Sequence, residues 1–268
     1  MESNSFRKLL LIFALIIAIP VMNAIYGMVS AVITGIIVLI AIIIILIRFS
    51  TRTGDKPKNR GICADIHSIN IKINGRNYII GEGAGFNLDD HEQPGIMSYV
   101  ENGVWYICDS PTETPTNSIA EITIPQDFHF NAFDVALNSG NLLINSLNSK
   151  RFGIAVYGDF AEIKSLKTTS LTASAGKGTL ILSTALTGNA TLSCGSGTLD
   201  VSFDEVADKF NLEAQTGAGA ILLNGDVIAD SANRNTKLDR NSSHTIKASC
   251  GLGKLSINFS EVTVDDEI

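Results

Sequence analysis

The sequence has little of the chemistry on which enzymes and metal centres depend. Its 268 residues include only four cysteines and four histidines, and no two cysteines are spaced as a C-x-x-C pair. A structural zinc site needs clustered ligands of that kind, and no histidine accompanies a serine or cysteine motif typical of a catalytic triad. We therefore expect a protein that is not an enzyme, with no catalytic residues, no metal site and no cofactor.

Basic side chains are scarce in most of the chain. Of the 27 Asp and Glu residues only Glu2 and Asp55 precede Gly61, whereas seven of the 20 Lys and Arg residues do, so the remainder carries a formal net charge of −12. A surface of that sign repels nucleic acid and anionic polymers. The composition therefore excludes nucleic acid as a partner.

Charged residues are absent from Leu9 to Ile47. One membrane span needs about 20 residues, so this run is long enough for two, with "PVMNAIYGM" as the break. We predict a two-helix membrane anchor over residues 1–50, with helices at about 8–22 and 28–48, so that the lipid bilayer is a partner through residues 8–48. A signal peptide cleaved after Ala24 is the alternative, which Met22 at the −3 position disfavours.

Seven basic residues flank the predicted helices: Arg7, Lys8, Arg48, Arg52, Lys56, Lys58 and Arg60. Basic flanks favour the cytoplasmic side of a membrane, and all seven fall on one side if both helices cross. We predict a two-pass cell-membrane protein with a basic linker at 51–61 and a cytoplasmic soluble domain. An extracellular domain, which would require a single span, is the alternative.

The soluble part begins with strands and turns over residues 62–124. "INIKINGRNYII" and "MSYVENGVWYI" each contain two alternating apolar runs around Asn-Gly. Asn-Gly favours the type I′ turn of a hairpin, because both of its central residues have positive φ. We predict β-hairpins at Asn74-Gly75 and Asn102-Gly103.

A repeat occupies residues 125–260. "GKGTL", "GSGTL", "GAGAI" and "GLGKL" share the form G-x-G-x-[Leu/Ile], "NSGNL" and "VYGDF" are weaker copies, and an inserted loop, "DVIADSANRNTKLDRNSSH", lengthens the last step. The strands beside these glycines alternate apolar and polar residues, so each buries one face. The predicted inward residues are Phe133, Val135, Leu137, Leu142, Ile144, Ile154, Val156, Leu171, Ala173, Leu180, Leu182, Leu192, Cys194, Leu199, Val201, Phe203, Phe210, Leu212, Ala214, Ile221, Leu223, Ile246, Ala248, Cys250, Leu255, Ile257 and Phe259.

A unit of about 20 residues with two strands cannot bury its apolar face alone, whereas stacked units can. The predicted fold class is therefore all-β: a β-solenoid resembling a single-stranded β-helix, preceded by the two transmembrane helices. No helix follows the glycine pairs, which excludes a phosphate-binding loop. We expect the glycines to provide tight corners, and Gly197→Val to be destabilising because valine tolerates positive φ badly.

The cysteines fit the same interpretation. Cys194 and Cys250 take the last inward position before a corner, where other units have Ala175 and Thr216. A position that accepts alanine and threonine requires a small side chain rather than a thiol. We expect Cys63, Cys108, Cys194 and Cys250 to be free thiols, as a cytoplasmic location favours.

Three further groups of residues resemble sites with chemical function. Asp89, Asp90, His91 and Glu92 could bind a divalent cation, but their spacing matches no calcium loop, and a solvated loop is the simpler interpretation. "GEGAGF" resembles a dinucleotide motif without the helix that such a motif requires. We interpret one group of charged residues as a solvated outer face: Asp159, Glu162, Lys164 and Lys167. The acidic tail at 261–268 is expected to block the open end of the solenoid from pairing with another chain.

The residues from about Ile62 to Phe259 resemble the putative-adhesin β-strand-repeat family, also called the toastrack domain. The resemblance is carried by "AEITIPQDFHFNAFDVALNSGNLLI", by the G-x-G-x-[Leu/Ile] ladder and by the closing "IKASCGLGKLSINF". It implies a β-solenoid on a membrane anchor, without catalytic residues, and either an adhesin or a module of membrane-stress signalling. We expect a membrane-tethered interaction module with an unidentified protein partner, such as a scaffold or sensor in envelope-stress signalling. An outward-facing adhesin or glycan-acting β-helix domain is the alternative.

Overall fold

The computed structural model describes residues 65–91, 94–110 and 118–260. The chain divides into two compact units, residues 1–56 and 57–268, and the described residues belong to the second. The predicted membrane anchor, the basic linker at 51–61 and the acidic tail at 261–268 lie outside the described residues. Within the described part, no helix is long and apolar enough to cross a bilayer.

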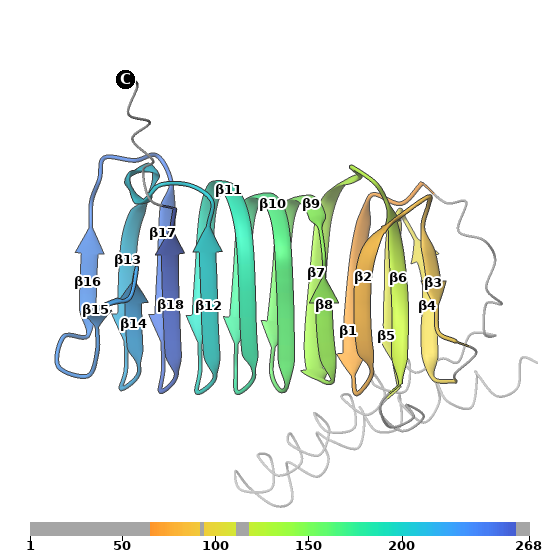
Figure 1. Ribbon diagram of the computed structural model, residues 1–268, viewed down its shortest axis with the longest axis horizontal. Coiled ribbons are helices and arrows are strands. Elements are labelled where there is room, and N and C mark those ends of the chain that lie inside the picture. The colour runs from red at the N-terminus through yellow and green to blue at the C-terminus, as the bar shows by residue number, and fades with distance from the viewer. Residues whose placement is uncertain (1–64, 92–93, 111–117, 261–268) are drawn as a thin grey trace, which may run out of the picture. The chain divides into compact units, whose positions relative to one another are not determined.

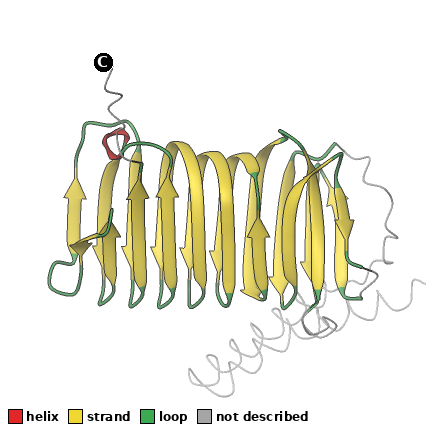
Figure 2. Cartoon of the chain, viewed as in Figure 1, coloured by secondary structure: helices red, strands yellow, loops and turns green. Residues whose placement is uncertain are grey.

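The described residues form an all-β solenoid in which each coil passes through two facing layers of strands (Figure 1). Most of it is strand, with loops and turns between the strands and one short 3-10 helix, η1 (Ala207–Lys209), in the described residues (Figure 2). Face A contains, in spatial order, β4 (Ile96–Glu101), β5 (Val104–Asp109), β1 (Ser68–Asn74), β7 (His129–Ser139), β9 (Leu147–Val156), the second halves of β10 (Phe160–Ala175) and β11 (Thr179–Cys194), β17 (Thr245–Cys250), β13 (Asn211–Thr216) and β16 (Asn235–Leu238).

Face B contains the partner strand of each coil. In spatial order these are β3 (Asn87–Asp89), β6 (Ile119–Pro125), β2 (Asn77–Gly83), β8 (Asn141–Ile144), the first halves of β10 and β11, β12 (Thr198–Phe203), β18 (Lys254–Phe259), β14 (Ala220–Leu223) and β15 (Asp226–Ala229). At one side of the stack the chain changes face through glycine corners. At the other, β10 and β11 continue through a bend marked by register shifts around Thr168.

The coils do not stack in sequence order, although the repeat pattern alone suggests that they would. The last coil, β17 and β18, lies between the coil of β11 and β12 and the coil of β13 and β14. The first coil, β1 and β2, likewise lies between β5/β6 and β7/β8 (Figure 1). All of these pairings are parallel. Both ends of the described chain therefore enter the stack from its interior.

Of the two predicted hairpins, one is confirmed and one is wrong. β4 and β5 pair antiparallel across Asn102 (φ 49°) and Gly103 (φ 73°), the positive values that a type I′ turn requires. β1 and β2 belong to opposite faces instead, and both pair in parallel with other coils. Asn74-Gly75 is therefore a coil corner. The hairpin prediction failed because a corner and a hairpin turn favour the same residues.

Antiparallel strands cover both ends of the stack. β4 and β3 pair with β5 and β6 at one end, and β16 and β15 pair with β13 and β14 at the other. The inserted loop of the last predicted repeat supplies β15 and β16. The acidic tail follows β18 in sequence and lies outside the described residues, so its predicted role stays a prediction; β15 and β16 are the outermost strands at this end of the stack.

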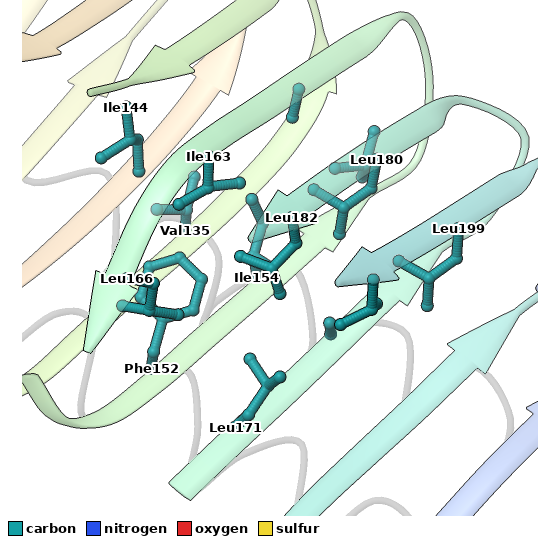
Figure 3. Close-up of a cluster of buried hydrophobic side chains, with 14 of the residues drawn as sticks. Val135, Ile144, Phe152, Ile154, Ile163, Leu166, Leu171, Leu180, Leu182 and Leu199 are labelled. Carbon is teal, nitrogen blue, oxygen red and sulfur yellow. The ribbon is translucent and has the colours of Figure 1, made fainter. Parts of the chain in front are cut away.

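The core lies between the two faces and consists of aligned rows of apolar side chains. Figure 3 shows Val135 and Ile154 of face A packed toward Ile163 and Leu182 of face B. All of the predicted inward residues are buried except Leu223, which is half-buried beside the end of the stack. Full burial of one such side chain contributes about 1.5–3 kcal/mol, so the rows supply the main driving force for stacking.

The corners require glycine because the backbones of neighbouring coils lie close together there, and not because the corner residues have unusual φ values. A Cβ atom on Gly197 would lie 2.1 Å from the carbonyl oxygen of Gly178, and one on Gly253 would lie 2.2 Å from that of Gly197. Gly197 does not have positive φ, so the reason given from sequence for the effect of Gly197→Val is wrong. Gly140 is different, because its φ of 94° is itself restrictive.

Candidate functional site

The outward side chains of face A form two straight rows, which we call the outer strip. Strand register aligns one row of Asp134, Gly153, Thr172, Thr191 and Lys247, and a second row of Ala136, Ala155, Ser174, Ser193 and Ser249. Most of these side chains are small, because large ones are confined to the inward positions of the same strands. The result is a flat polar surface that extends across five strands.

The two ends of face A differ from its centre. At the β4 end, the rings of Tyr99 and Tyr106 stack with centroids 5.1 Å apart. At the β16 end, the Glu213 carboxylate lies 3.3 Å from the Lys237 ammonium and 3.9 Å from that of Lys247. An extended ligand on the strip would therefore meet aromatic rings at one end and paired charges at the other.

Three shallow depressions lie on this face. One of about 450 Å³ surrounds Glu213 and its lysines, and one of about 290 Å³ lies over Gly153 and Ala155, where the side chains are smallest. The third, of about 400 Å³, lies where β9, β10 and β11 bend and is lined by Lys150 and Lys167. All three are open to solvent, which suits the docking of a surface rather than the enclosure of a small molecule.

A buried polar cluster lies near the β4 end of the solenoid. Asp109 is fully buried, and its carboxylate accepts the backbone N–H groups of Asn74 at 2.7 Å and Arg76 at 3.1 Å. The fully buried Arg76 donates from Nη2 to the Pro94 carbonyl at 2.8 Å. Burial raises the pKa of Asp109, and these N–H donors oppose that rise. The cluster has no opening to solvent, so we assign it to holding the corner and the segment at Pro94.

Tyr78 lies beside this cluster. Its hydroxyl group is buried and has no hydrogen-bond partner among the described residues. Burial and the nearby Asp109 both raise its pKa. A neutral phenol is therefore retained there at any physiological pH.

The cysteines occupy the inward positions that were predicted to require small side chains. Ala175, Cys194, Cys250 and Thr216 follow one another along a single inward row, and Cys194 and Cys250 are buried free thiols. Each thiol contacts a corner carbonyl, Gly197 for Cys194 and Gly253 for Cys250, both at 3.2 Å. Cys108 is also free, whereas Cys63 lies outside the described residues.

The Cys194 thiol is a poor nucleophile. Burial, followed by the neighbouring Cys250, raises its pKa to about 11. Because the thiolate is the reactive form, a thiol that stays protonated at neutral pH does not support redox or nucleophilic chemistry.

The acidic loop is an exposed turn. His91 has a φ of 53°, and its ring nitrogens lie 3.5 Å from an Asp89 oxygen and 4.0 Å from a Glu121 oxygen. Glu92 lies outside the described residues. In the part of the chain that the structure describes, no group of three or more His, Cys, Asp or Glu side chains is arranged to hold a metal ion.

The structure separates the charged residues that the sequence places near one another. Glu162 belongs to face B, where it aligns with Leu143, whereas Lys167 follows the bend and aligns with Asn148 of β9. Asp159 forms part of a corner and accepts the Gly140 N–H at 2.7 Å. "GEGAGF" leads from β2 into β3 rather than into a helix.

Sequence reasoning missed the outer strip. Its signal is present in the residues between the inward ones, since "TAS", "TLS" and "KAS" precede three of the corners with the same outward serine. Alternation alone identifies those serines only as the polar half of each strand. Their alignment depends on coil order, which the repeat does not reveal.

Comparison with known proteins gives a similarity to solved structures alone. No protein-family model matches the chain, and neither does any curated protein. Among solved structures, a chain described as a "putative cell adhesion protein" from Clostridium sporogenes is similar, with 14% sequence identity and a TM-score of 0.41. The alignment covers 74% of this chain and 94% of that one. A likeness this loose carries no conclusion about function.

Proposed function

We propose that this chain is a non-catalytic interaction module that holds a partner against the outer strip of face A. The observation that supports the proposal is the register of the strip. One outward position is filled by a small side chain in five adjacent strands: Ala136, Ala155, Ser174, Ser193 and Ser249. Stacked repeats use such extended surfaces to bind other molecules, and a flat surface suits a protein better than a small ligand.

We further propose that the module is tethered to a membrane through residues 8–48 and faces the cytoplasm. The uncharged run from Leu9 to Ile47 and the seven basic flanking residues support this part of the proposal. The sequence resemblance to the toastrack family favours a scaffold or sensor role in membrane-stress signalling. The alternative is an outward-facing adhesin or glycan-acting domain.

A photo-crosslinking experiment tests the use of the strip. A benzophenone amino acid replaces Ser174 or Ser193 on face A, and Ser256 on face B serves as the control because it is equally half-buried. In living cells we expect the two strip positions to give an adduct of the same size and the Ser256 position to give none. Equal adducts from both faces would contradict a specific binding face.

A cysteine-labelling experiment tests the orientation. Ser231→Cys places a thiol in an exposed turn, in a background where Cys63 and Cys108 are replaced by serine. An impermeant maleimide should label this thiol only after the cells are lysed. Labelling of intact cells would overturn the cytoplasmic orientation and favour the outward-facing alternative.

A further inference from the structure

Positive charge is concentrated at one bend of an acidic domain. Of the thirteen Lys and Arg residues after Gly61, four fall within the short segment from Lys150 to Lys167: Lys150, Arg151, Lys164 and Lys167. Lys150 and Lys167 both line the third depression of face A, although they come from different strands, β9 and β10. We call this depression of about 400 Å³ the lysine groove.

A repeated irregularity of the strands forms the groove. The register of β10 against β11 shifts between Thr168 and Ser170, so Thr169 has no direct partner in the ladder. The facing position is Gly188, where a Cβ atom would lie 2.1 Å from the Thr169 carbonyl oxygen. Because no side chain fills this space, the strands come together and the exposed side chains of Thr169 and Thr187 line the groove.

No carboxylate of the described residues forms an ion pair with the lysines of the groove. None of the residues that line it is acidic, and within the described residues neither Lys150 nor Lys167 forms an ion pair. The nearby carboxylate of Asp134 pairs with Arg151 at 3.1 Å. The carboxylate of Glu205, which follows β12, accepts a hydrogen bond from the Leu186 N–H at 3.1 Å.

Polar side chains surround the two lysines. The hydroxyl groups of Thr169 and Thr187 lie 3.4 Å apart, and the Asn131 and His129 side chains complete the wall on the β7 side. Two ammonium groups with several neutral donors suit a compact anion of more than one negative charge. A phosphate group fits this description, since it carries about −1.5 to −2 charges and three acceptor oxygens.

We propose that the lysine groove binds a phosphate group, carried either by a soluble phosphate compound or by a lipid headgroup. This inference rests on the proposed binding role of face A and adds a ligand class to it. The formal net charge of −12 carried by residues 61–268 disfavours anions elsewhere on the domain, so the groove provides a local exception. Lysine ammonium groups act as point charges at such a site.

The test uses the full chain, purified in a nonionic maltoside detergent, with binding measured by calorimetry. Inorganic pyrophosphate probes the soluble source, dihexanoyl phosphatidate probes the headgroup source, and dihexanoyl phosphatidylcholine is the zwitterionic control. We expect one of the first two probes to bind, and the tighter one identifies the source. Lys150→Gln with Lys167→Gln should weaken binding by roughly tenfold for each lysine, the effect of one lost charge-assisted hydrogen bond.

The matched control is Lys177→Gln with Lys254→Gln, which removes two exposed lysines that form no ion pair in the described part of the chain. This variant should bind the probe within about threefold of the native chain, because a distant surface charge is screened by salt. All four lysines are exposed, and thermal melts check that both variants are folded. Lys150→Glu alone gives an independent variant, which should abolish binding.

The proposal would be overturned if neither phosphate probe bound to the native chain. It would also be overturned if both double variants bound the probe more weakly by the same factor. Neither result depends on Ser174 or Ser193, the two crosslinking positions that test the proposed function. Loss of crosslinking from the outer strip with intact phosphate binding would count against the proposed protein partner alone. Loss of phosphate binding with intact crosslinking would count against the lysine groove alone.

Discussion

Cys194 and Cys250 are direct neighbours, paired in the parallel strands β11 and β17. They come from "SCGSGTLDV" and "SCGLGKLSI", which are separated in sequence by a complete coil and the inserted loop. The two segments become adjacent because the last coil lies beside the coil of β11 and β12. This pairing places two buried thiols side by side in a row that otherwise contains alanine and threonine.

Replacing both thiols should have only a small effect on stability. In Cys194→Ala with Cys250→Ala, we expect a loss of about 1 kcal/mol for each buried sulfur, because Ala175 and Thr216 already occupy the flanking positions of the row. Thermal melts with and without reductant or chelator provide the measurement. A much larger loss, or chelator sensitivity in the native protein alone, would indicate that the thiols have a redox or metal function.

Alkaline pH should destabilise the protein through Cys194. Its pKa rises from 9.0 to about 11 in the folded state, so above pH 9 the thiol ionises more readily in the unfolded chain than in the folded one. The contribution of the protonated thiol to the free energy of unfolding is therefore fully present below pH 9 and is lost as the pH rises through about 11. The expected loss is about 2–3 kcal/mol. Denaturant unfolding at pH 8 and pH 10.5 should show a smaller drop for Cys194→Ala than for the native chain. The buried Tyr78 remains in both proteins, so equal drops would contradict the role of Cys194.

The stacked corners should not tolerate a side chain. Gly197→Ala places a Cβ atom 2.1 Å from the Gly178 carbonyl oxygen, and the strands must separate to admit it, at a cost of about 1–3 kcal/mol. Gly85→Ala is the control, since a Cβ atom there meets nothing within 4 Å. Denaturant midpoints measure both, and similar values for the two variants would show that corner crowding is unimportant.

The buried Asp109 should be far more important for stability than an exposed carboxylate. Asp109→Asn removes the charge beside the buried Arg76 and presents an amide donor toward backbone N–H groups, so we expect a loss of about 3 kcal/mol. Asp134→Asn, at the exposed pair with Arg151, should cost about 0–1 kcal/mol. Free energies of unfolding for both variants test this difference, and a near-neutral Asp109→Asn would disprove it.

The sequence predicts which side chains face inward, because alternation and glycine spacing are local properties. The row of Ala175, Cys194 and Thr216 was identified in this way. Coil order is not local: four of the corners share the form G-x-G-x-[Leu/Ile], so the coils that carry them can pair with one another in the same register. For that reason the adjacency of Cys194 with Cys250 was not predictable, and neither was the placement of Lys150 and Lys167 in one depression at a strand irregularity.

A solenoid whose repeats contact only their sequence neighbours can grow one rung at a time, but this chain cannot do so at its C-terminal end. The coil of β13 and β14 joins the rest of the stack through β17 and β18. Residues 211–238 can therefore reach their final neighbours only after β17 and β18 have been synthesised. Closure of that end is a single late event with long-range contacts, and a chain that stops before Thr245 loses the attachment of its terminal cap together with its last coil.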